Sequence, residues 1–152
     1  MIVGPPRGSQ SYNRSVEHPN AELATRAWEA IANSDIDALN ELWAPDIVWH
    51  ATSDNPWFGD HVGIDAILDY LAAVGEAGET YDTRLIDVLV SNDRVLLVTR
   101  LTARRFGKQI ETSQCMLARI ENAQIAEVWI LALDPEVFVG FWENPPAVEQ
   151  AG

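Results

Sequence analysis

The sequence predicts an α+β protein built as one domain, with helices first and an antiparallel sheet after them. Residues 20 to about 77 carry apolar side chains at helical spacing in three segments. Residues 83 to 133 instead form strand-like runs, separated by short turns. The chain has 152 residues, a usual length for one domain. Sequential strands joined by short turns usually pair, so a meander packed on helices is expected.

Two helices are expected at the start of the domain. The first spans about residues 21–33, with Asn20 as its N-cap, because an Asn side chain accepts a hydrogen bond from a free N–H group of the first turn. The second is expected to begin at Ser34, with Asp37 three residues later in the place of a capping-box acid. Pro45 is expected to end it, because proline cannot continue the backbone ladder.

The middle of the chain predicts a short strand, a loop and a third helix. Residues 47–49 are apolar and read as the strand. Residues 52–63 are rich in turn-forming types, and Gly59 and Gly63 are expected to serve turns and the start of the next helix. Residues 64–77 have apolar positions at helical spacing, so the third helix is placed there.

Four long strands and a terminal helical turn are expected in the second half. The strands are placed at residues 83–90, 94–105, 109–120 and 125–133. Asp134 followed by Pro135 predicts a short helix that ends near Trp142, because Asp suits an N-cap and Pro the first helical position.

The two ends differ in composition from the rest of the chain. Residues 1–19 and 144–152 are rich in Pro, Gly and small polar types, so we expect a flexible N-terminal arm, a folded domain over 20–143 and a flexible C-terminal tail.

Charge and cysteine content restrict the classes of partner. The formal net charge is −13, which argues against binding of nucleic acid or an anionic membrane. No apolar stretch approaches the ~20 residues that span a bilayer, and no signal peptide is recognised. Cys115 is the single cysteine, so no intrachain disulfide can form and a cytoplasmic location is expected. We expect Cys115 to be a small buried residue.

Several segments resemble the NTF2-like superfamily. Residues 33–50 follow its opening pattern, small-Asp-Leu/Ile-Asp-x-Leu-x-x-Leu-aromatic-Ala-x-Asp-Val-x-aromatic. Residues 55–67 are similar to the N-P-x-x-G-x-x-x-G-x-x-x-I stretch of the SnoaL-like branch, which includes polyketide cyclase and ketosteroid isomerase-like proteins. Residues 125–129 and the later Asp134 and Phe141-Trp142 resemble the same branch. The resemblance covers about residues 20–142.

This resemblance implies an NTF2-like cone, in which a curved, mostly antiparallel sheet wraps over the N-terminal helices. Enzymes of this fold use no metal and no cofactor, and they bind a small hydrophobic molecule inside the cone. An apolar pocket raises a carboxyl pKa and strengthens hydrogen bonds to developing charge. The outer face of the sheet commonly forms a homodimer. We therefore expect a small hydrophobic ligand and a homodimer, with no cofactor, nucleic acid or membrane.

Three reactions of the superfamily each need particular residues, and this chain matches none of the three patterns fully. The ketosteroid isomerase positions, aligned through residues 35–37, fall on Ala51 and Ala27, which cannot transfer protons. Arg100 matches the arginine of the epoxide hydrolase pattern, but Thr102 replaces one of its aspartates. SnoaL-like cyclases use an acid near the end of the last strand, and Asp134 lies near that point, where it would equally suit an N-cap.

His50 is the sharpest catalytic candidate, because an imidazole can donate or accept a proton near neutral pH. Asp54 and His61 could complete a dyad with it, and the alternative is that these residues make local turns or face solvent. A single β-bulge would reverse the face on which His50 lies. The separated histidines and lone cysteine do not suit a metal site. The candidate catalytic residues are His50, Asp54, Asp134 and Arg100.

Aromatic side chains are the candidate ligand contacts, since they could line a pocket for a flat molecule, although core packing is the alternative for each. Trp57 and Phe58 lie in a loop and could form a lid or a dimer contact. Arg100 must be paired if it faces the cone, whereas Arg104 and Arg105 are expected to face solvent. The candidate ligand-binding residues are Trp28, Trp49, Trp57, Phe58, His61 and Trp129.

Three functions stay open from the sequence. The first is a cofactor-free isomerase, cyclase or dehydratase acting on a small hydrophobic carbonyl compound, with His50 transferring the proton. The second keeps the cone as a binding site without chemistry, which the alanines at positions 27 and 51 favour. The third is a dimeric assembly module whose cone is filled by its own side chains.

Overall fold

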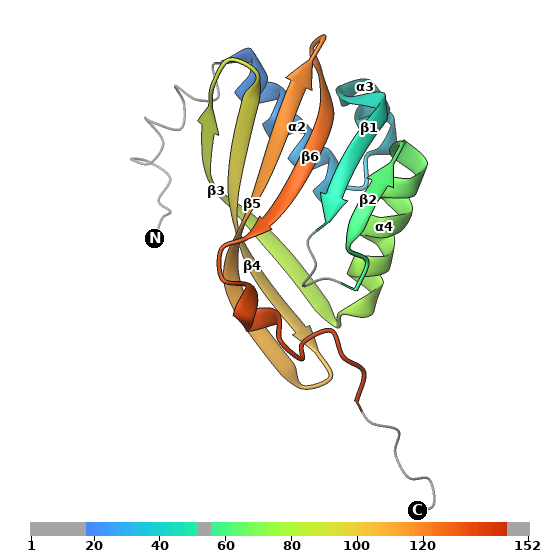
Figure 1. Ribbon diagram of the computed structural model, residues 1–152, viewed down its shortest axis with the longest axis vertical. Helices are drawn as coiled ribbons and strands as arrows, with labels where there is room; N and C mark the ends of the chain where they lie inside the picture. The colour runs from blue at the N-terminus through green and yellow to red at the C-terminus, as the bar shows by residue number, and fades with distance from the viewer. Residues whose placement is uncertain (1–17, 52–55, 146–152) are drawn as a thin grey trace, which may run out of the picture.

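Six strands form one curved, open sheet in the order β2-β1-β6-β5-β4-β3 (Figure 1). The computed structural model describes residues 18–51 and 56–145. All neighbouring strands are antiparallel except β1 and β6, which are parallel. The strands are β1 (Trp43–Ala51), β2 (Gly59–Val62), β3 (Thr80–Val90), β4 (Arg94–Arg105), β5 (Lys108–Glu121) and β6 (Gln124–Ala132). This arrangement confirms the predicted α+β, cone-like fold.

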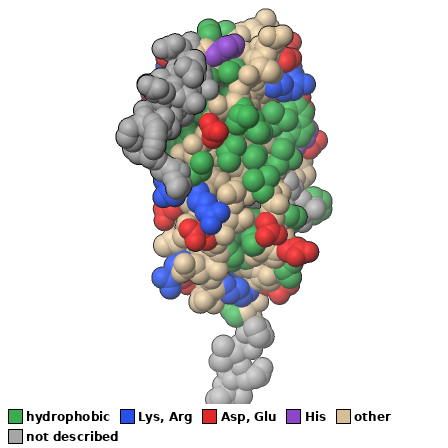
Figure 2. Space-filling model, turned by 90° about the vertical axis from the view of Figure 1, so that its left-hand side faces the viewer, with side chains coloured by type: hydrophobic (Ala, Val, Ile, Leu, Met, Phe, Trp, Pro, Cys, Tyr) green, Lys and Arg blue, Asp and Glu red, His purple; other side chains and the backbone are tan. Residues whose placement is uncertain are grey.

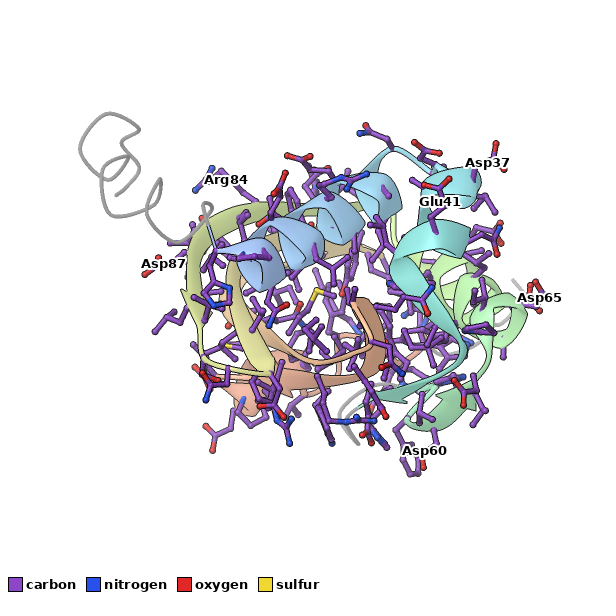
Figure 3. The ribbon with its side chains drawn as sticks, turned by 90° about the horizontal axis from the view of Figure 1, so that it is seen from above. Asp37, Glu41, Asp60, Asp65, Arg84 and Asp87 are labelled. Carbon is purple, nitrogen blue, oxygen red and sulfur yellow. The ribbon has the colours of Figure 1, made fainter. Side chains whose placement is uncertain are left out.

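In the described part of the chain, three α-helices accompany the sheet, namely α2 (Pro19–Ala32), α3 (Ile36–Leu42) and α4 (Ile64–Ala77). Seen from above, the sheet curves around α2 and encloses the interior of the cone (Figure 3). Helix α4 packs on β1 and β2 at one edge. The main core lies between helices and sheet, and Ala21, Leu39, Ile47 and Ile67 are among its fully enclosed members.

The starts of the first two helices differ from the prediction. His18, and not Asn20, is the N-cap of α2, and its Nδ1 accepts a hydrogen bond from the backbone N–H of Asn20 at 3.1 Å. Asp35, and not Ser34, caps α3 through a hydrogen bond from the Ala38 N–H at 3.2 Å. Pro19 occupies the first position of α2, which needs no N–H donor, so the helix begins two residues earlier than predicted.

The region around β1 was also misjudged. Pro45 does not end α3, since the helix stops at Leu42 and Pro45 lies inside β1, where the register with β6 shifts between Trp43 and Val48. Proline donates no ladder hydrogen bond, and an irregularity of this kind accommodates it. Strand β2 lies inside the segment predicted as a loop, because four residues are too few to show an alternating pattern.

The remaining elements follow the prediction closely. Helix α4 has the predicted bounds, and Gly63 is its N-cap with φ +92°, a conformation that glycine adopts readily. Strand β4 has the predicted bounds, and β3, β5 and β6 differ only at their ends. Asp134 precedes a short 3₁₀ helix, η1 (Pro135–Phe138), but its side chain makes no capping hydrogen bond. This helix ends at Phe138, whereas the prediction placed its end near Trp142.

Cys115 is buried, as predicted, and burial raises the pKa of its thiol. Most of the predicted arm (residues 1–19) and tail (residues 144–152) lies outside the described residues, which leave out 1–17 and 146–152, while Pro19 of the predicted arm is part of α2. In residues 18–51 and 56–145, no helix has the length and apolar character needed to cross a membrane.

Candidate ligand-binding cone

A cavity of about 450 Å³ lies between the inner face of the sheet and helices α2 and α4. This volume is within the ~300–1,000 Å³ range of small-molecule sites. Its walls come from α2, α3 and the turn between them, from α4, and from the inner faces of strands β1 and β3–β6. The lining residues include Trp28, Ile31, Ile36, Leu39, Trp49, Leu68, Tyr70, Leu71, Val74, Tyr81, Thr83, Thr99, Gln114, Met116 and Ile130.

Strand alternation decides which side chains reach the cavity. Successive side chains of a strand point to opposite faces, so every second residue faces the helices. Thr99 and Gln114 are register partners on β4 and β5, and Met116 and Ile130 are partners on β5 and β6. All four therefore share the inner face and form one continuous wall.

The polar groups on this wall are uncharged. The Thr99 hydroxyl donates a hydrogen bond to the Gln114 carbonyl at 3.4 Å, and the Gln114 side-chain amide belongs to the cavity lining. The indole N–H of Trp49 is buried without a hydrogen-bond partner among the described residues. No Asp, Glu, His, Lys or Arg from residues 18–51 or 56–145 lines the cavity. The cavity can therefore bind a neutral molecule through apolar contacts and a few hydrogen bonds.

His50 lies on the opposite face of the sheet, because it follows the cavity-lining Trp49 in the same strand. Its Nδ1 contacts Asp60 Oδ1 at 2.7 Å, and its Nε2 contacts Glu127 Oε2 at 2.6 Å. Each carboxylate can accept a hydrogen bond from its ring nitrogen only when Nδ1 and Nε2 both carry a proton, that is, when the imidazole is positively charged. Burial alone would lower the pKa of His50, but the hydrogen bonds to Glu127 and Asp60 outweigh it and hold the pKa above 6.5. His50 is therefore an ion-pair centre outside the cavity.

The cluster around His50 extends across four strands. Glu127 also accepts from Arg119 Nε at 3.1 Å, and Arg119 Nη1 donates to Glu121 at 2.9 Å. The hydrogen bond from His50, against the effect of burial and together with that from Arg119, lowers the pKa of Glu127. The Trp129 ring stacks on the imidazole with ring centres 5.2 Å apart. Sequence reasoning missed Glu127 and Asp60, because these partners are 77 and 10 residues from His50.

Two further catalytic candidates also lie away from the cavity lining. Arg100 is on the outer face, where it donates to the Ser113 hydroxyl at 3.2 Å and lies 3.8 Å from Glu111. Asp134 is exposed and precedes η1. Asp54 lies outside the described residues. The structure thus brings no two of the four predicted catalytic residues into contact within its described part.

The aromatic candidates divide between the two faces of the sheet. Trp28 and Trp49 line the cavity, whereas Trp129 lies on the outer face beside His50. Trp57 packs against Trp142 with ring centres 5.4 Å apart, and Phe58 is 63% exposed.

His61 lies on the inner side of β2, where its Nε2–H donates to the Trp57 carbonyl at 2.7 Å. Its ring stacks on that of Tyr70, which lines the cavity, with centres 4.4 Å apart. His61 therefore packs against a residue of the cavity wall and is not itself part of the described lining.

Residues 24–128 match the family model of the SnoaL-like domain. The chain belongs to the SnoaL-like family. It is 29% identical to Bal32a, from a soil-derived mobile gene cassette, with a TM-score of 0.76 over 82% of this chain and 97% of that one. A putative polyketide cyclase from Sinorhizobium meliloti is 25% identical, with a TM-score of 0.60 over 72% and 93% of the two chains. An NTF2-like protein from Burkholderia pseudomallei, 15% identical, shares the fold with a TM-score of 0.73 over 83% and 98%.

Several charged side chains of this SnoaL-like domain lie at its periphery. Asp37 and Glu41 on α3, Asp65 on α4, and Arg84 and Asp87 on β3 point away from the interior (Figure 3). Among the described residues, no group of three His, Cys, Asp or Glu side chains is placed to hold a metal ion. The cavity itself is lined by neutral, mostly apolar residues of the described structure, and the buried Arg105 is not among them.

Proposed function

We propose that the SnoaL-like cone binds a small, neutral, mostly apolar molecule that carries a carbonyl group. The observation that carries this proposal is the cavity of about 450 Å³, whose described lining is apolar except for neutral groups such as Thr99 and Gln114. Apolar walls supply the binding free energy, and a few placed donors fix the orientation of a ligand. The Gln114 amide is the donor that we propose for the carbonyl oxygen.

Charge favours a neutral ligand over an acid. The protein carries a formal net charge of −13, and no cation of the described residues lines the cavity. A carboxylate in this cavity would lose its hydration without gaining a partner of opposite charge, which costs several kcal/mol. We therefore expect ketones to bind and carboxylic acids of the same shape to be excluded.

A matched pair of aromatic compounds tests this expectation. In a thermal-shift experiment, 2-acetylnaphthalene should raise the melting temperature, whereas 2-naphthoate should not. A ligand at about 100 times its dissociation constant adds ~2.7 kcal/mol, which corresponds to roughly 5–11 °C for a domain of this size. Equal shifts for ketone and acid, or no shift for a wider set of neutral ketones, would contradict the proposal.

Two neighbouring substitutions on β5 locate the site. Gln114→Leu should weaken binding of the ketone about tenfold, because it removes the proposed hydrogen bond while keeping the apolar volume. Ser113→Ala, on the outer face one residue away, should leave the affinity unchanged. Isothermal titration calorimetry would compare the two variants.

Proton transfer in the same cone is a second candidate function. The similarity to a putative polyketide cyclase favours it. His50 and Asp134 lie outside the cavity lining. Asp54 lies outside the described residues, and we propose it for the proton transfer from its place in the sequence alone; the product would be that of a cofactor-free isomerase, cyclase or dehydratase. Asp54→Asn should abolish turnover of a ketone that the cone binds while keeping its affinity. Unchanged turnover in Asp54→Asn would leave binding alone as the function.

The outer face of the sheet supports a homodimer. Hydrophobic side chains gather over the upper part of the face in Figure 2. Register places Leu89, Leu96 and Leu117 side by side on this face, with Leu131 beside Cys115. Leu89 is 50% exposed and Leu131 41%, which is unusual for large apolar side chains grouped on one sheet face.

We propose that a second copy of this chain covers that face, and Leu117→Arg tests it. The variant places a charge in the centre of the apolar patch, so it should be a monomer by size-exclusion chromatography with light scattering, whereas the wild type should be a dimer. Val139→Arg, at an 81%-exposed position outside the sheet, is the control. A monomeric wild type would contradict the proposal.

A further inference from the structure

The segment that follows β6 crosses the lower end of the cone (Figure 1). After η1 it continues as residues 139–144, which we call the strap. Phe141 in the strap and Phe138 just before it are buried in a second apolar cluster with Leu101 and Ala103 of β4. The strap is therefore packed into the fold and lies across the ends of β4 and β5.

Arg105 holds the strap in place. The sequence suggested a solvent-facing side chain, but Arg105 is 8% exposed, because it occupies the inward-facing series of β4 with Leu101 and Ala103. Its Nη1 donates to the carbonyls of Phe141 at 3.2 Å and Glu143 at 2.8 Å, and its Nη2 donates to Asn144 Oδ1 at 2.8 Å.

The same guanidinium also ties the strap to α4. Arg105 Nε donates to the carbonyl of Ala77, the last residue of α4, at 3.0 Å. The carbonyl end of a helix attracts a cation, and the planar fork of arginine can serve several oxygens at once. Lys108 adds contacts to the carbonyls of Gly140 and Glu143. Two cations therefore bind strap carbonyls, in place of the carboxylates that usually pair with them.

Trp142 connects the strap to a residue of the cavity wall. Its ring centre lies 6.2 Å from that of Tyr81, which lines the cavity, and 5.4 Å from that of Trp57. Trp142 also packs 5.0 Å from Phe141 and beneath the Arg105 guanidinium at 5.9 Å. Trp142 belongs to both apolar clusters, so it stands between the cavity wall and the lower end of the cone.

We propose that the strap is the end wall of the cone, and that Trp142, held in position by Arg105, limits the length of the ligand. This inference rests on the proposed binding of neutral carbonyl compounds. It assigns the ligand to short or compact ketones, since a long alkyl chain would meet Tyr81 and Trp142. Trp142 is a specificity-determining residue in this proposal, and Arg105 is a positioning residue that acts through it.

A homologous series of methyl ketones, from 2-hexanone to 2-tridecanone, tests the length limit. In the wild type, each added methylene should raise affinity about fourfold until the chain reaches the wall, after which affinity should stop rising or fall. In Trp142→Ala the rise should continue by at least two more methylenes, a gain of about tenfold or more for the longest ketones. Trp129→Ala, a tryptophan on the outer face, should keep the wild-type limit.

A measurement without ligand tests the role of Arg105. Hydrogen–deuterium exchange of the strap amides should accelerate in Arg105→Gln, while exchange in β1 and β6 stays as in the wild type. Arg105→Lys keeps the positive charge but loses the planar guanidinium with its several donors. The strap amides should therefore exchange at a rate between those of the wild type and Arg105→Gln. The length limit in Arg105→Gln should shift in the same direction as in Trp142→Ala.

The possible results separate this inference from the function on which it rests. Ketones that bind both proteins with the same length limit would overturn the wall proposal and leave ligand binding in place. Unchanged strap exchange in Arg105→Gln would overturn the role of Arg105. Failure of every ketone to bind the wild type would overturn the proposed function and, with it, the limit on ligand length.

Discussion

The ion pairs of His50 predict a stability that depends on pH in a defined direction. His50 bridges Asp60 on β2 and Glu127 on β6, at 2.7 and 2.6 Å. Both contacts need a protonated imidazole, and together they raise its pKa above 6.5 against the effect of burial. His50→Ala removes both contacts and leaves Glu127 paired with Arg119 alone.

The expected size follows from the exposure of the partners. Glu127 is 24% exposed, so its hydrogen bond to a charged imidazole is worth about 1.5 kcal/mol, the lower end of the charged range. Asp60 is 62% exposed, so solvent screens its contact to ~0.5 kcal/mol. The sum of about 2 kcal/mol corresponds to a decrease in melting temperature of roughly 4–8 °C for a domain of this size.

The sign of the pH dependence is determined by the direction of the two pKa shifts. The folded pKa of His50 is raised, so its contribution is complete below the unfolded value of 6.5 and is lost as the pH rises through the folded pKa. The folded pKa of Glu127 is lowered, so its contribution is present above 4.5 and is lost as the pH falls through its folded pKa. Wild type and His50→Ala should therefore differ most between about pH 5 and pH 6.5.

Urea denaturation of both proteins at low salt, in steps from about pH 5 to pH 9, measures this difference. Ile67→Ala is the control, because it removes a buried side chain that carries no ionisable group, so its effect should not change over this pH range. A difference in unfolding free energy that stays constant, or grows, as the pH rises would refute the reasoning.

Four further substitutions, one of them a control at an exposed position, test the fold by urea denaturation. Ile67→Ala, at a position with no exposed surface, should cost about 2–5 kcal/mol, whereas Val139→Ala, at an 81%-exposed position, should cost less than ~0.5 kcal/mol. Asp35→Ala should cost about 1 kcal/mol, because it removes the cap on the Ala38 N–H, and an unchanged stability would show that this cap is not needed. Gly63→Ala should cost about 1 kcal/mol or more, because φ is +92° there, and a stabilised variant would contradict that strain.

Local sequence signals predicted most of the secondary structure. The bounds of α4 and β4 were predicted to the residue, since a regular apolar period runs through each and turn residues flank it. The predicted limits of α3 were wrong where each rested on a single residue. Ser34 looked like a cap, but its backbone turns to φ +55° and leaves Asp35 in the capping position. Pro45 looked like a helix end, yet an irregular register lets β1 include it.

The candidate site was predicted less well, because it depends on which face each side chain takes. Trp28 and Trp49 line the cavity, and their contact with a ligand stays a prediction. The partners of His50 come from β2 and β6, and no local pattern in the chain links those segments. Gln114 and Thr99 carry no strong sequence signal, since neutral polar residues in strands are common on either face.

The sequence by itself determined that this is an α+β domain, because helix and strand periods and turns act between residues close together in the chain. Its motifs, and not these periods, are what resemble the SnoaL-like family. Tertiary structure alone decided which side of the sheet His50 takes, since strand pairing assigns faces and a shift of one residue reverses them. It likewise decided that Arg105 is buried, because the oxygens that bind its guanidinium come from residues 28 to 39 positions away. A charge can be buried only where such partners converge, and that convergence exists only in the folded chain.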